Sequence, residues 1–434
     1  MDPRLKKGEV KMRVFLTFLI ALIIAPSTIF AQLKEGDYVV FGVPTALGSI
    51  EGRDGWMSVQ MAVEEINKKG GIKIGQKRHQ IKAYAIDTRE HEPGIPLHDA
   101  LIAQEKLILE RKPHAIVLGN FRSEVLLSTM DLIAKYKIPY ICSIAMTPLM
   151  QKKVVEDYEK YKYTFRNALN APYLSMYLSK LMEFIQKEFG FSRAYLVVQD
   201  TLWAVATGSG LEKWFKENKW DVVGFDKYPL GATDFATSLM KVRAQKADVL
   251  IPIFDMPQSG ILLKQARAMK VEALPVGFIS PIAPENAYEV FEGEVEGFVN
   301  LVFEVGPLPV KAVPKSMEYN RNFGKRWGEA ARKSLSGHGP GPSYDAVYIM
   351  AYAIEKAGTL DPDAIVKALE ATDMQGVIGR IKFGKDHQVI FGMDPKEAAI
   401  GAAFQWRQGK RIVVFPDVVA EGKIELPPYV KSKK

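Results

Sequence analysis

Residues 38–71, YVVFGVPTALGSIEGRDGWMSVQMAVEEINKKGG, decide the fold of this chain of 434 residues. Residues 38–43 are a short apolar run, which predicts a strand buried on both faces. A turn rich in glycine and serine follows over residues 46–55, and apolar residues then recur at helical spacing until Gly70 and Gly71 end the helix. In open α/β sheets, ligands bind beyond the carboxyl ends of such strands, next to the N-termini of helices.

The alternation of strand and helix patterns continues beyond this unit. Strand patterns alternate with amphipathic helix patterns up to a link at residues 160–172, and the alternation then restarts and runs to residue 279. This order predicts two successive doubly wound α/β units, each with a parallel sheet and helices on both faces. From residue 297 the chain instead shows three helix patterns, at 315–334, 344–357 and 362–371, followed by strand patterns at 376–382 and 402–415.

Composition and charge describe an ordinary globular protein. The chain is 47% hydrophobic and 25% charged, and its length suffices for two domains with their own cores. The formal net charge of +8 is modest for this size, so nucleic-acid binding is not expected. Cys142 is the only cysteine and lies in an apolar run, which excludes an intrachain disulfide and predicts a buried, inert thiol.

Residues 1–31 have the pattern of a secretory signal peptide. Lys11 and Arg13 form a basic region, residues 14–25 are apolar but too short to span a bilayer, and residues 29–31 form a cleavage site with a small residue at its end. The mature chain is therefore expected to begin at Gln32 and to be periplasmic, and Met12 is an alternative start.

Several short motifs carry a resemblance to a known family. The run AVEEIN at residues 62–67, followed by Gly70 and Gly71, is similar to the first helix of periplasmic solute-binding proteins of the branched-chain amino-acid type, which serve ABC transporters. Four further motifs resemble family landmarks in family order: GATDF at 231–235, KQAR at 264–267, YDAVY at 344–348 and FQW at 404–406.

The resemblance implies a type I periplasmic binding fold, in which two α/β lobes are joined by three crossovers. These crossovers would lie near residues 163–166, 296–302 and 377–381. Lobe 1 would then comprise residues 32–163 and 297–376, lobe 2 residues 164–296 and 377–420, and residues 421–434 would be a tail.

The resemblance also implies ligand-binding positions in lobe 1. Glu51 falls where family members often carry an aromatic residue over the ligand, Arg122 and Ser123 match a small polar loop, and Ala145 and Met146 match the loop after the fourth strand. Independently, Ser123 lies at a predicted helix start whose free N–H groups favour an anion, and Arg122 could pair with a carboxylate. Alternatively, Ser123 only caps its helix, and Arg122 and Glu51 are simply exposed.

In lobe 2 the resemblance implies three ligand-binding positions, which are occupied by Trp203 or Thr207, by Asp255 and by Ile279. Trp203 could instead cap the core from a loop, and Asp255 could cap a helix or take an ammonium group. Relatives that bind α-amino acids usually have a hydroxyl where Met146 stands and a carboxylate where Ile279 stands. These two departures favour a larger apolar or aromatic carboxylate, with Trp203 stacking and Arg122 or Ser123 orienting the ligand.

No motif for a bound cofactor, a metal or catalysis accompanies these residues. The chain has no GxGxxG after a strand, no GxxxxGK[ST], no HExxH and no GxSxG. Together with this absence, the resemblance implies a monomeric binding protein that delivers an amino acid or related carboxylate to the permease subunits and ATPases of an importer, without cofactor. A ligand-sensing receptor domain and an exported α/β hydrolase are the alternatives.

Overall fold

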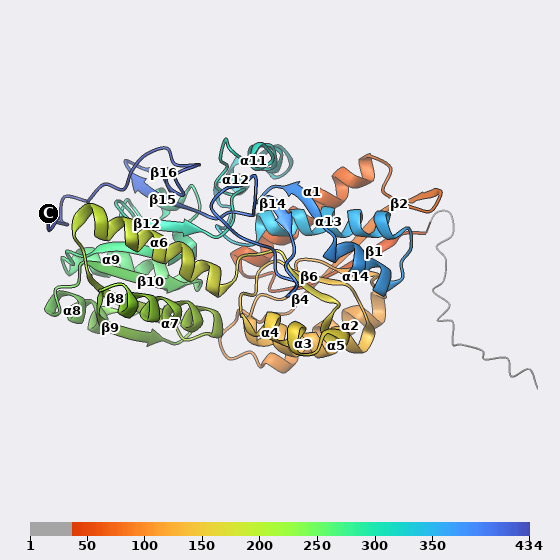
Figure 1. Ribbon diagram of the computed structural model, residues 1–434, viewed down its shortest axis with the longest axis horizontal. Coiled ribbons are helices and arrows are strands. Elements are labelled where there is room, and N and C mark those ends of the chain that lie inside the picture. Colours follow the sequence, from red (N-terminus) through yellow and green to blue (C-terminus); the bar gives the residue numbers. More distant parts are fainter. Residues whose placement is uncertain (1–36) are drawn as a thin grey trace, which may run out of the picture. The chain divides into compact units, whose positions relative to one another are not determined.

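A computed structural model describes residues 37–434, which are built on two main β-sheets (Figure 1). The predicted signal peptide, residues 1–31, lies outside the described residues. The expected α/β class with two mainly parallel sheets is confirmed. Within the described part of the chain, no helix is long and apolar enough to cross a membrane.

The first sheet is entirely parallel and forms the core of lobe 1. Its strands, in spatial order, are β4 (Ile81–Asp87), β1 (Val39–Thr45), β5 (Ala115–Ile116), β6 (Tyr140–Cys142) and β7 (Thr164–Arg166). The apolar run predicted as a strand buried on both faces is β1, in which Val39, Phe41 and Val43 are fully buried. The Cys142 thiol is buried in β6, as expected.

The second sheet forms the core of lobe 2 and is parallel except at one edge. Its strands, in spatial order, are β9 (Asp221–Tyr228), β8 (Arg193–Gln199), β10 (Val249–Phe254), β11 (Leu274–Ile279), β12 (Val299–Val302), β15 (Ala402–Arg407) and β16 (Lys410–Phe415). The last two strands pair antiparallel and are joined by a short turn.

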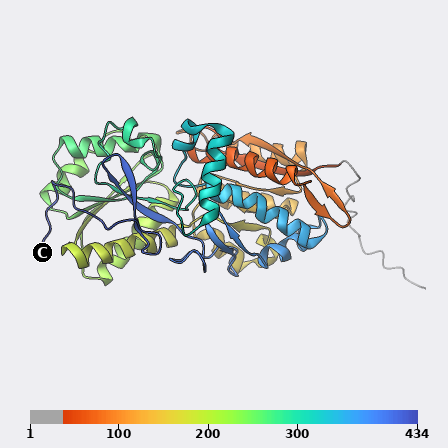
Figure 2. The same cartoon turned by 90° about the horizontal axis from the view of Figure 1, so that it is seen from above.

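Helices cover both sheets. Those of lobe 1 are α1 (Ile50–Lys68), α2 (Leu97–Arg111), α3 (Ser123–Tyr136), α4 (Leu149–Glu156), α5 (Tyr158–Tyr161), α11 (Pro314–Trp327), α12 (Glu329–Lys333), α13 (Pro340–Ala357) and α14 (Pro362–Glu370). Those of lobe 2 are α6 (Ala171–Phe189), α7 (Leu202–Glu217), α8 (Ala236–Ala244), α9 (Ile261–Ala268) and α10 (Ala287–Val290), with 3-10 turns η1 (Pro257–Gly260) and η2 (Ser280–Ile282). Figure 2 shows α1 and α13, far apart in sequence, packed side by side.

The chain changes lobes later than the sequence suggested at two crossovers. Strand β7 belongs to the first sheet although residue 164 was expected to open lobe 2, and β12 belongs to the second sheet although residue 297 was expected to return to lobe 1. Both strands end the parallel part of their sheets and lead directly into a crossover. Strand and crossover are equally apolar here, so hydrophobicity alone does not show where the sheet ends.

The third crossover is also longer than expected. Residues 377–381 lie in a small hairpin of β13 (Asp373–Gly376) and β14 (Gly379–Lys382), not in a simple crossing. The chain then runs back along lobe 1, where Gln388 forms a parallel bridge with Arg166, and it joins the second sheet only at β15. Residues 421–434, predicted as a tail, form no helix or strand but pack against lobe 2, where Ile424 and Val430 are buried.

Asp345 holds the start of the third crossover in place. Its carboxylate, buried on α13, accepts hydrogen bonds from the backbone N–H groups of Val377, at 2.8 and 2.9 Å, and Ile378, at 3.2 Å. Within the described chain these two N–H groups have no other hydrogen-bond acceptor, so Asp345 links the last helices of lobe 1 to the hairpin.

Replacing this carboxylate should therefore destabilise the protein. We expect Asp345→Ala to lower the free energy of unfolding by about 1–3 kcal/mol, because two buried donors lose their acceptor, and Asp345→Asn to cost less because one oxygen remains. Urea denaturation measures both. Asp361→Ala, which removes the N-cap of α14, is the control. If Asp345→Ala lowered the free energy of unfolding no more than this control does, the role of Asp345 in holding the crossover would be contradicted.

Candidate functional site

A cavity of about 240 Å³ lies where the carboxyl ends of the parallel strands of both sheets meet. In open α/β sheets this end of the strands is where ligands bind. Lobe 1 lines the cavity with Ser49, Ile50, Glu51, His91, Glu92, Pro93, Phe121, Arg122 and Glu124. Lobe 2 lines it with Gln199, Thr201, Trp203, Leu230, Gly231, Asp255, Met256, Pro257, Gln258 and Pro281.

The turn between β1 and α1 positions Glu51. Ser49 is the N-cap of α1, and its hydroxyl accepts a hydrogen bond of 2.9 Å from the backbone N–H of Gly52. A Cβ on Gly52 would lie 2.1 Å from the carbonyl oxygen of Ala46, so this turn needs glycine here. Glu51 thus lies in the first helical turn, where the free N–H groups favour a carboxylate.

Glu51 is buried and connects the two lobes. Its side chain accepts a short hydrogen bond from the hydroxyl of Ser280, which lies in η2 of lobe 2. The residue is only 1% exposed, so the alternative of an exposed loop residue is wrong. Burial and the nearby carboxylate of Asp255 raise the pKa of Glu51 to about 7.

Asp255 follows β10 and is held by two donors from lobe 2. Its carboxylate accepts hydrogen bonds from Nε2 of Gln199, at 2.6 Å, and from Nε1 of Trp203, at 2.9 Å. The side-chain oxygen of Gln199 in turn accepts from the backbone N–H groups of Asp255 and Met256. Burial raises the pKa of Asp255 to about 6. Trp203 was expected in a loop, but α7 begins at Leu202 and places Trp203 in the first helical turn.

Arg122 precedes α3 and faces the cavity. Its guanidinium lies 3.5 Å from the carboxylate of Glu124, and its buried Nε has no hydrogen-bond partner among residues 37–434. The loop is fixed by buried Glu90, whose carboxylate accepts from the backbone N–H groups of Phe121, at 3.0 Å, and Arg122, at 2.9 Å. Sequence reasoning missed Glu90, because nothing in its local pattern shows that it reaches a loop 31 residues away.

Four of the nine predicted site residues line the cavity together: Glu51, Arg122, Trp203 and Asp255. Met146 instead lines an adjoining crevice of about 10 Å³ that it shares with Glu51, Trp203 and Asp255. The other four, Ser123, Ala145, Thr207 and Ile279, line neither space and are buried.

These four buried residues make contacts that support the site. The hydroxyl of Ser123 accepts a hydrogen bond of 3.3 Å from the backbone N–H of Met146, so it fixes the neighbouring loop instead of capping α3. The hydroxyl of Thr207 donates to the carbonyl of Trp203 at 2.9 Å. The carbonyl of Ala145 accepts a hydrogen bond from the guanidinium of buried Arg166. The backbone N–H of Ile279 donates a hydrogen bond to the side-chain oxygen of buried Asn300.

His338 joins the crossovers next to the crevice and was not predicted. Its Nε2 lies 2.8 Å from the carbonyl oxygen of Ile144, and its Nδ1 lies 3.1 Å from the carboxylate of Glu304. Glu304 also accepts from the backbone N–H of Leu169, so this pair connects the first two crossovers to lobe 1. Burial lowers the pKa of His338, but the Glu304 carboxylate and the carbonyl outweigh it and the net effect is a raised pKa.

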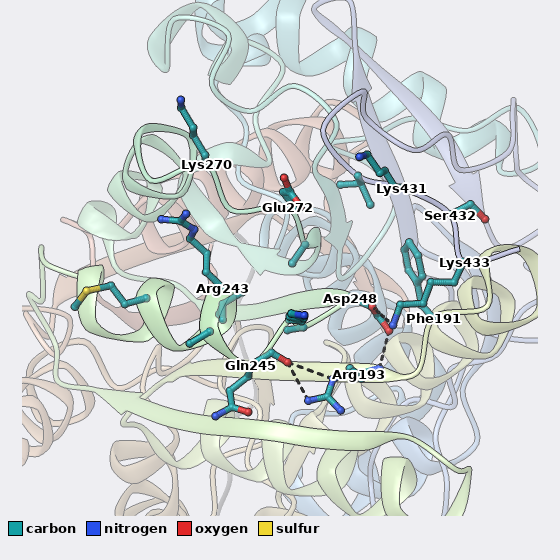
Figure 3. A pocket seen from close by; sticks show the side chains of 17 residues that line it. Phe191, Arg193, Arg243, Gln245, Asp248, Lys270, Glu272, Lys431, Ser432 and Lys433 are labelled. Atoms are coloured by element: carbon teal, nitrogen blue, oxygen red, sulfur yellow. Dashed lines mark hydrogen bonds and ion pairs between the residues drawn. The ribbon is translucent and has the colours of Figure 1, made fainter.

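A larger hollow of about 1130 Å³ lies at the other end of the lobe 2 strands (Figure 3). It is lined by the start of β8, the ends of α8 and α9 and the C-terminal residues 430–433. Asp248 at its base is already paired with Lys433 at 2.6 Å and accepts from the backbone of Arg193. This hollow lies away from the carboxyl ends of the strands, so the cavity containing Glu51 and Asp255 is the candidate ligand site.

Two α/β lobes with a polar cavity at the carboxyl ends of both sheets define a two-lobed ligand-binding protein. The sequence pattern of the periplasmic binding protein family matches residues 43–398, and the chain belongs to this family. Its members bind solutes and are not enzymes. In the described residues, no three histidine, cysteine, aspartate or glutamate side chains gather as a metal site.

Known proteins of this kind share the whole architecture. Leu/Ile/Val-binding protein homolog 7 of Brucella suis is 22% identical over 425 residues, covering 94% of this chain and 97% of that protein. The branched-chain amino acid transporter substrate-binding protein LivJ of Streptococcus pneumoniae, solved with isoleucine, has a TM-score of 0.70 at 20% identity, covering 88% of this chain and all of that one. A solute-binding protein of R. palustris in complex with benzoate has a TM-score of 0.70 at 14% identity, covering 92% and 100%.

The raised pKa of Glu51 predicts how stability depends on pH. The folded protein retains this proton up to about pH 7, whereas the unfolded chain releases it near the ordinary pKa of 4.5. The folded state therefore binds more protons between these values, and the free energy of unfolding should fall as pH rises from 5 to 8. The raised pKa of His338 acts in the same direction.

Glu51→Gln should remove the part of this fall that belongs to Glu51, on the order of 2 kcal/mol. Urea denaturation of the free protein at pH 5 and pH 8 measures the effect. Glu64→Gln is the control, because Glu64 is exposed and paired with Arg326, and its pKa is lowered. An equal pH dependence for Glu51→Gln and the native protein would show that Glu51 is not a buried, proton-holding group.

Proposed function

We propose that this protein is the substrate-binding protein of an ABC importer, which traps an amino acid or related carboxylate between its lobes and delivers it to a membrane permease. The observation that carries the proposal is the cavity of about 240 Å³ that both lobes line at the carboxyl ends of their strands. Membership of the periplasmic binding protein family and the names of the relatives, which include proteins solved with isoleucine and with benzoate, support it.

The cavity contains the groups that such a solute needs. Arg122 offers a guanidinium whose Nε lies 3.5 Å from the Glu124 carboxylate but has no hydrogen-bond partner in the described chain, and a charge-assisted bond from it can orient a carboxylate. Trp203 and Phe121 offer aromatic surface for an apolar side chain, and Asp255, fixed by Gln199 and Trp203, offers an acceptor for an amine.

Binding would favour the closed arrangement of the lobes. A ligand that contacts Arg122 of lobe 1 and Asp255 of lobe 2 at once gains both contacts only when the lobes are close, and this difference shifts the population to the closed state. The hydrogen bond between Glu51 and Ser280 adds a direct contact between the lobes in that state. The permease and its ATPases would bind the closed form. We place the protein in the periplasm after removal of residues 1–31, acting as a monomer.

A thermal-shift screen tests this function. The purified protein, stripped of carried-over solute by partial unfolding, should melt at higher temperature with rising concentrations of its amino-acid or carboxylate ligand, because the ligand binds only the folded state. Failure of every amino acid and carboxylate to shift the melting temperature would contradict the proposal.

Arg122→Ala tests the orienting contact separately. We expect about 10- to 100-fold weaker binding of the carboxylate and little change for its neutral amide, because only the charged group uses the guanidinium. Arg53→Ala, at a half-exposed arginine on α1 outside the cavity lining, is the matched control. Equal losses for the acid and the amide would exclude this role for Arg122.

A further inference from the structure

The charges around the cavity do not balance. Four carboxyl groups line it, those of Glu51, Glu92, Glu124 and Asp255. Glu92 is paired with Arg89, at 2.6 Å, and Glu124 lies 3.5 Å from Arg122. Among the described residues, Glu51 and Asp255 form no ion pair; their side chains accept hydrogen bonds only from neutral groups of Ser280, Gln199 and Trp203.

His338 does not supply the missing charge. It faces Glu51 and Asp255 across the crevice, and a charged imidazolium there lowers the pKa of both. However, its Nδ1 is engaged by the carboxylate of Glu304 at 3.1 Å, and its Nε2 bonds to the Ile144 carbonyl. One imidazole thus faces three carboxyl groups, and two of them remain without a matching cation in the described chain.

The two unmatched carboxyl groups come from opposite lobes and share the same space. Glu51 in α1 and Asp255 after β10 both line the cavity, and both line the crevice of about 10 Å³ at its edge. The indole of Trp203 lines both spaces as well and donates its N–H to Asp255. Buried carboxyl groups are costly unless a cation or a proton neutralises them.

We propose that the solute of this cavity carries a net positive charge and that its cationic nitrogen, an ammonium, amidinium or guanidinium group, is held between Glu51 of lobe 1 and Asp255 of lobe 2. This inference rests on the proposed function: it selects basic amino acids from the amino acids and carboxylates proposed there, and it adds amines that lack a carboxylate. A carboxylate on such a solute would contact Arg122, whereas a simple carboxylate would add negative charge to a site that already has an excess.

The cationic nitrogen takes the place of protons. In the free protein the raised pKa of Glu51, about 7, leaves this carboxyl group partly protonated at neutral pH, and the raised pKa of Asp255, about 6, leaves it protonated at lower pH. Asp255 also faces the charge of Glu124, which raises its pKa, while His338 lowers it. A bound cation lowers the pKa of both carboxyl groups, so they release protons on binding. The affinity for the cation therefore increases from pH 5 to pH 8.

Isothermal titration calorimetry of the solute-free protein tests this proposal with matched ligands. Lysine and norleucine differ only in the terminal amine, and agmatine and putrescine are amines without a carboxylate. We expect a member of the cationic set (lysine, arginine, agmatine and putrescine) to bind at least about tenfold more tightly than norleucine, leucine or benzoate. Titration in two buffers of different ionisation enthalpy at pH 7 should show protons released to the buffer.

Two isosteric variants locate the effect. Glu51→Gln and Asp255→Asn should each weaken binding of that cation at least about tenfold and leave the free protein folded, because they remove buried charge. Glu105→Gln on α2, outside the cavity lining, is the control and should bind normally. Circular dichroism melts confirm that each variant is folded.

The outcomes separate the two proposals. Tightest binding of leucine, norleucine or benzoate would overturn the cationic ligand while leaving the binding-protein function in place. Two results would show that the nitrogen does not lie between Glu51 and Asp255. One is binding of the cation without release of protons, and the other is an unchanged affinity for the cation in both variants. Binding of no amino acid, amine or carboxylate would overturn both the function and the inference.

Discussion

Two carboxyl groups buried on opposite walls of one cavity set the main physical constraint on this protein. Glu51 belongs to lobe 1 and Asp255 to lobe 2, and bringing the lobes together brings their charges together in a poorly solvated space. Repulsion and burial oppose closure unless protons or a ligand supply positive charge. The lobes are therefore sensitive to what occupies the space between them, which is the property a two-lobed binding protein needs.

The surrounding structure holds these two groups firmly. The turn at Gly52 fixes Glu51 at the start of α1, and Gln199 and Trp203 fix both oxygens of Asp255. The pair of His338 and Glu304 joins two crossovers beside the crevice. A site built this way limits the entropy that is lost when a ligand binds.

The sequence predicted the architecture well because strand and helix patterns alternate clearly, and four of the nine residues it named, Glu51, Arg122, Trp203 and Asp255, line the cavity. The sequence-based prediction was wrong or incomplete where contacts between residues far apart in the chain determine the structure. The boundaries at β7 and β12 depend on which sheet a strand joins, and Glu90, Glu304 and His338 act through partners distant in the sequence. Ser123, Ala145, Thr207 and Ile279 line neither the cavity nor the crevice because they are buried in the packed interior, which local sequence cannot show.

A double-mutant cycle between Glu51→Gln and Asp255→Asn, measured as unfolding free energy of the solute-free protein at pH 8, tests the central claim most directly. At that pH both carboxyl groups are ionised, since their pKa values are about 7 and about 6. We predict that each single change stabilises the protein and that the double change gains less than the sum, because either one removes the same repulsion. Strict additivity would show that the two carboxyl groups do not interact across the cavity and would contradict the account.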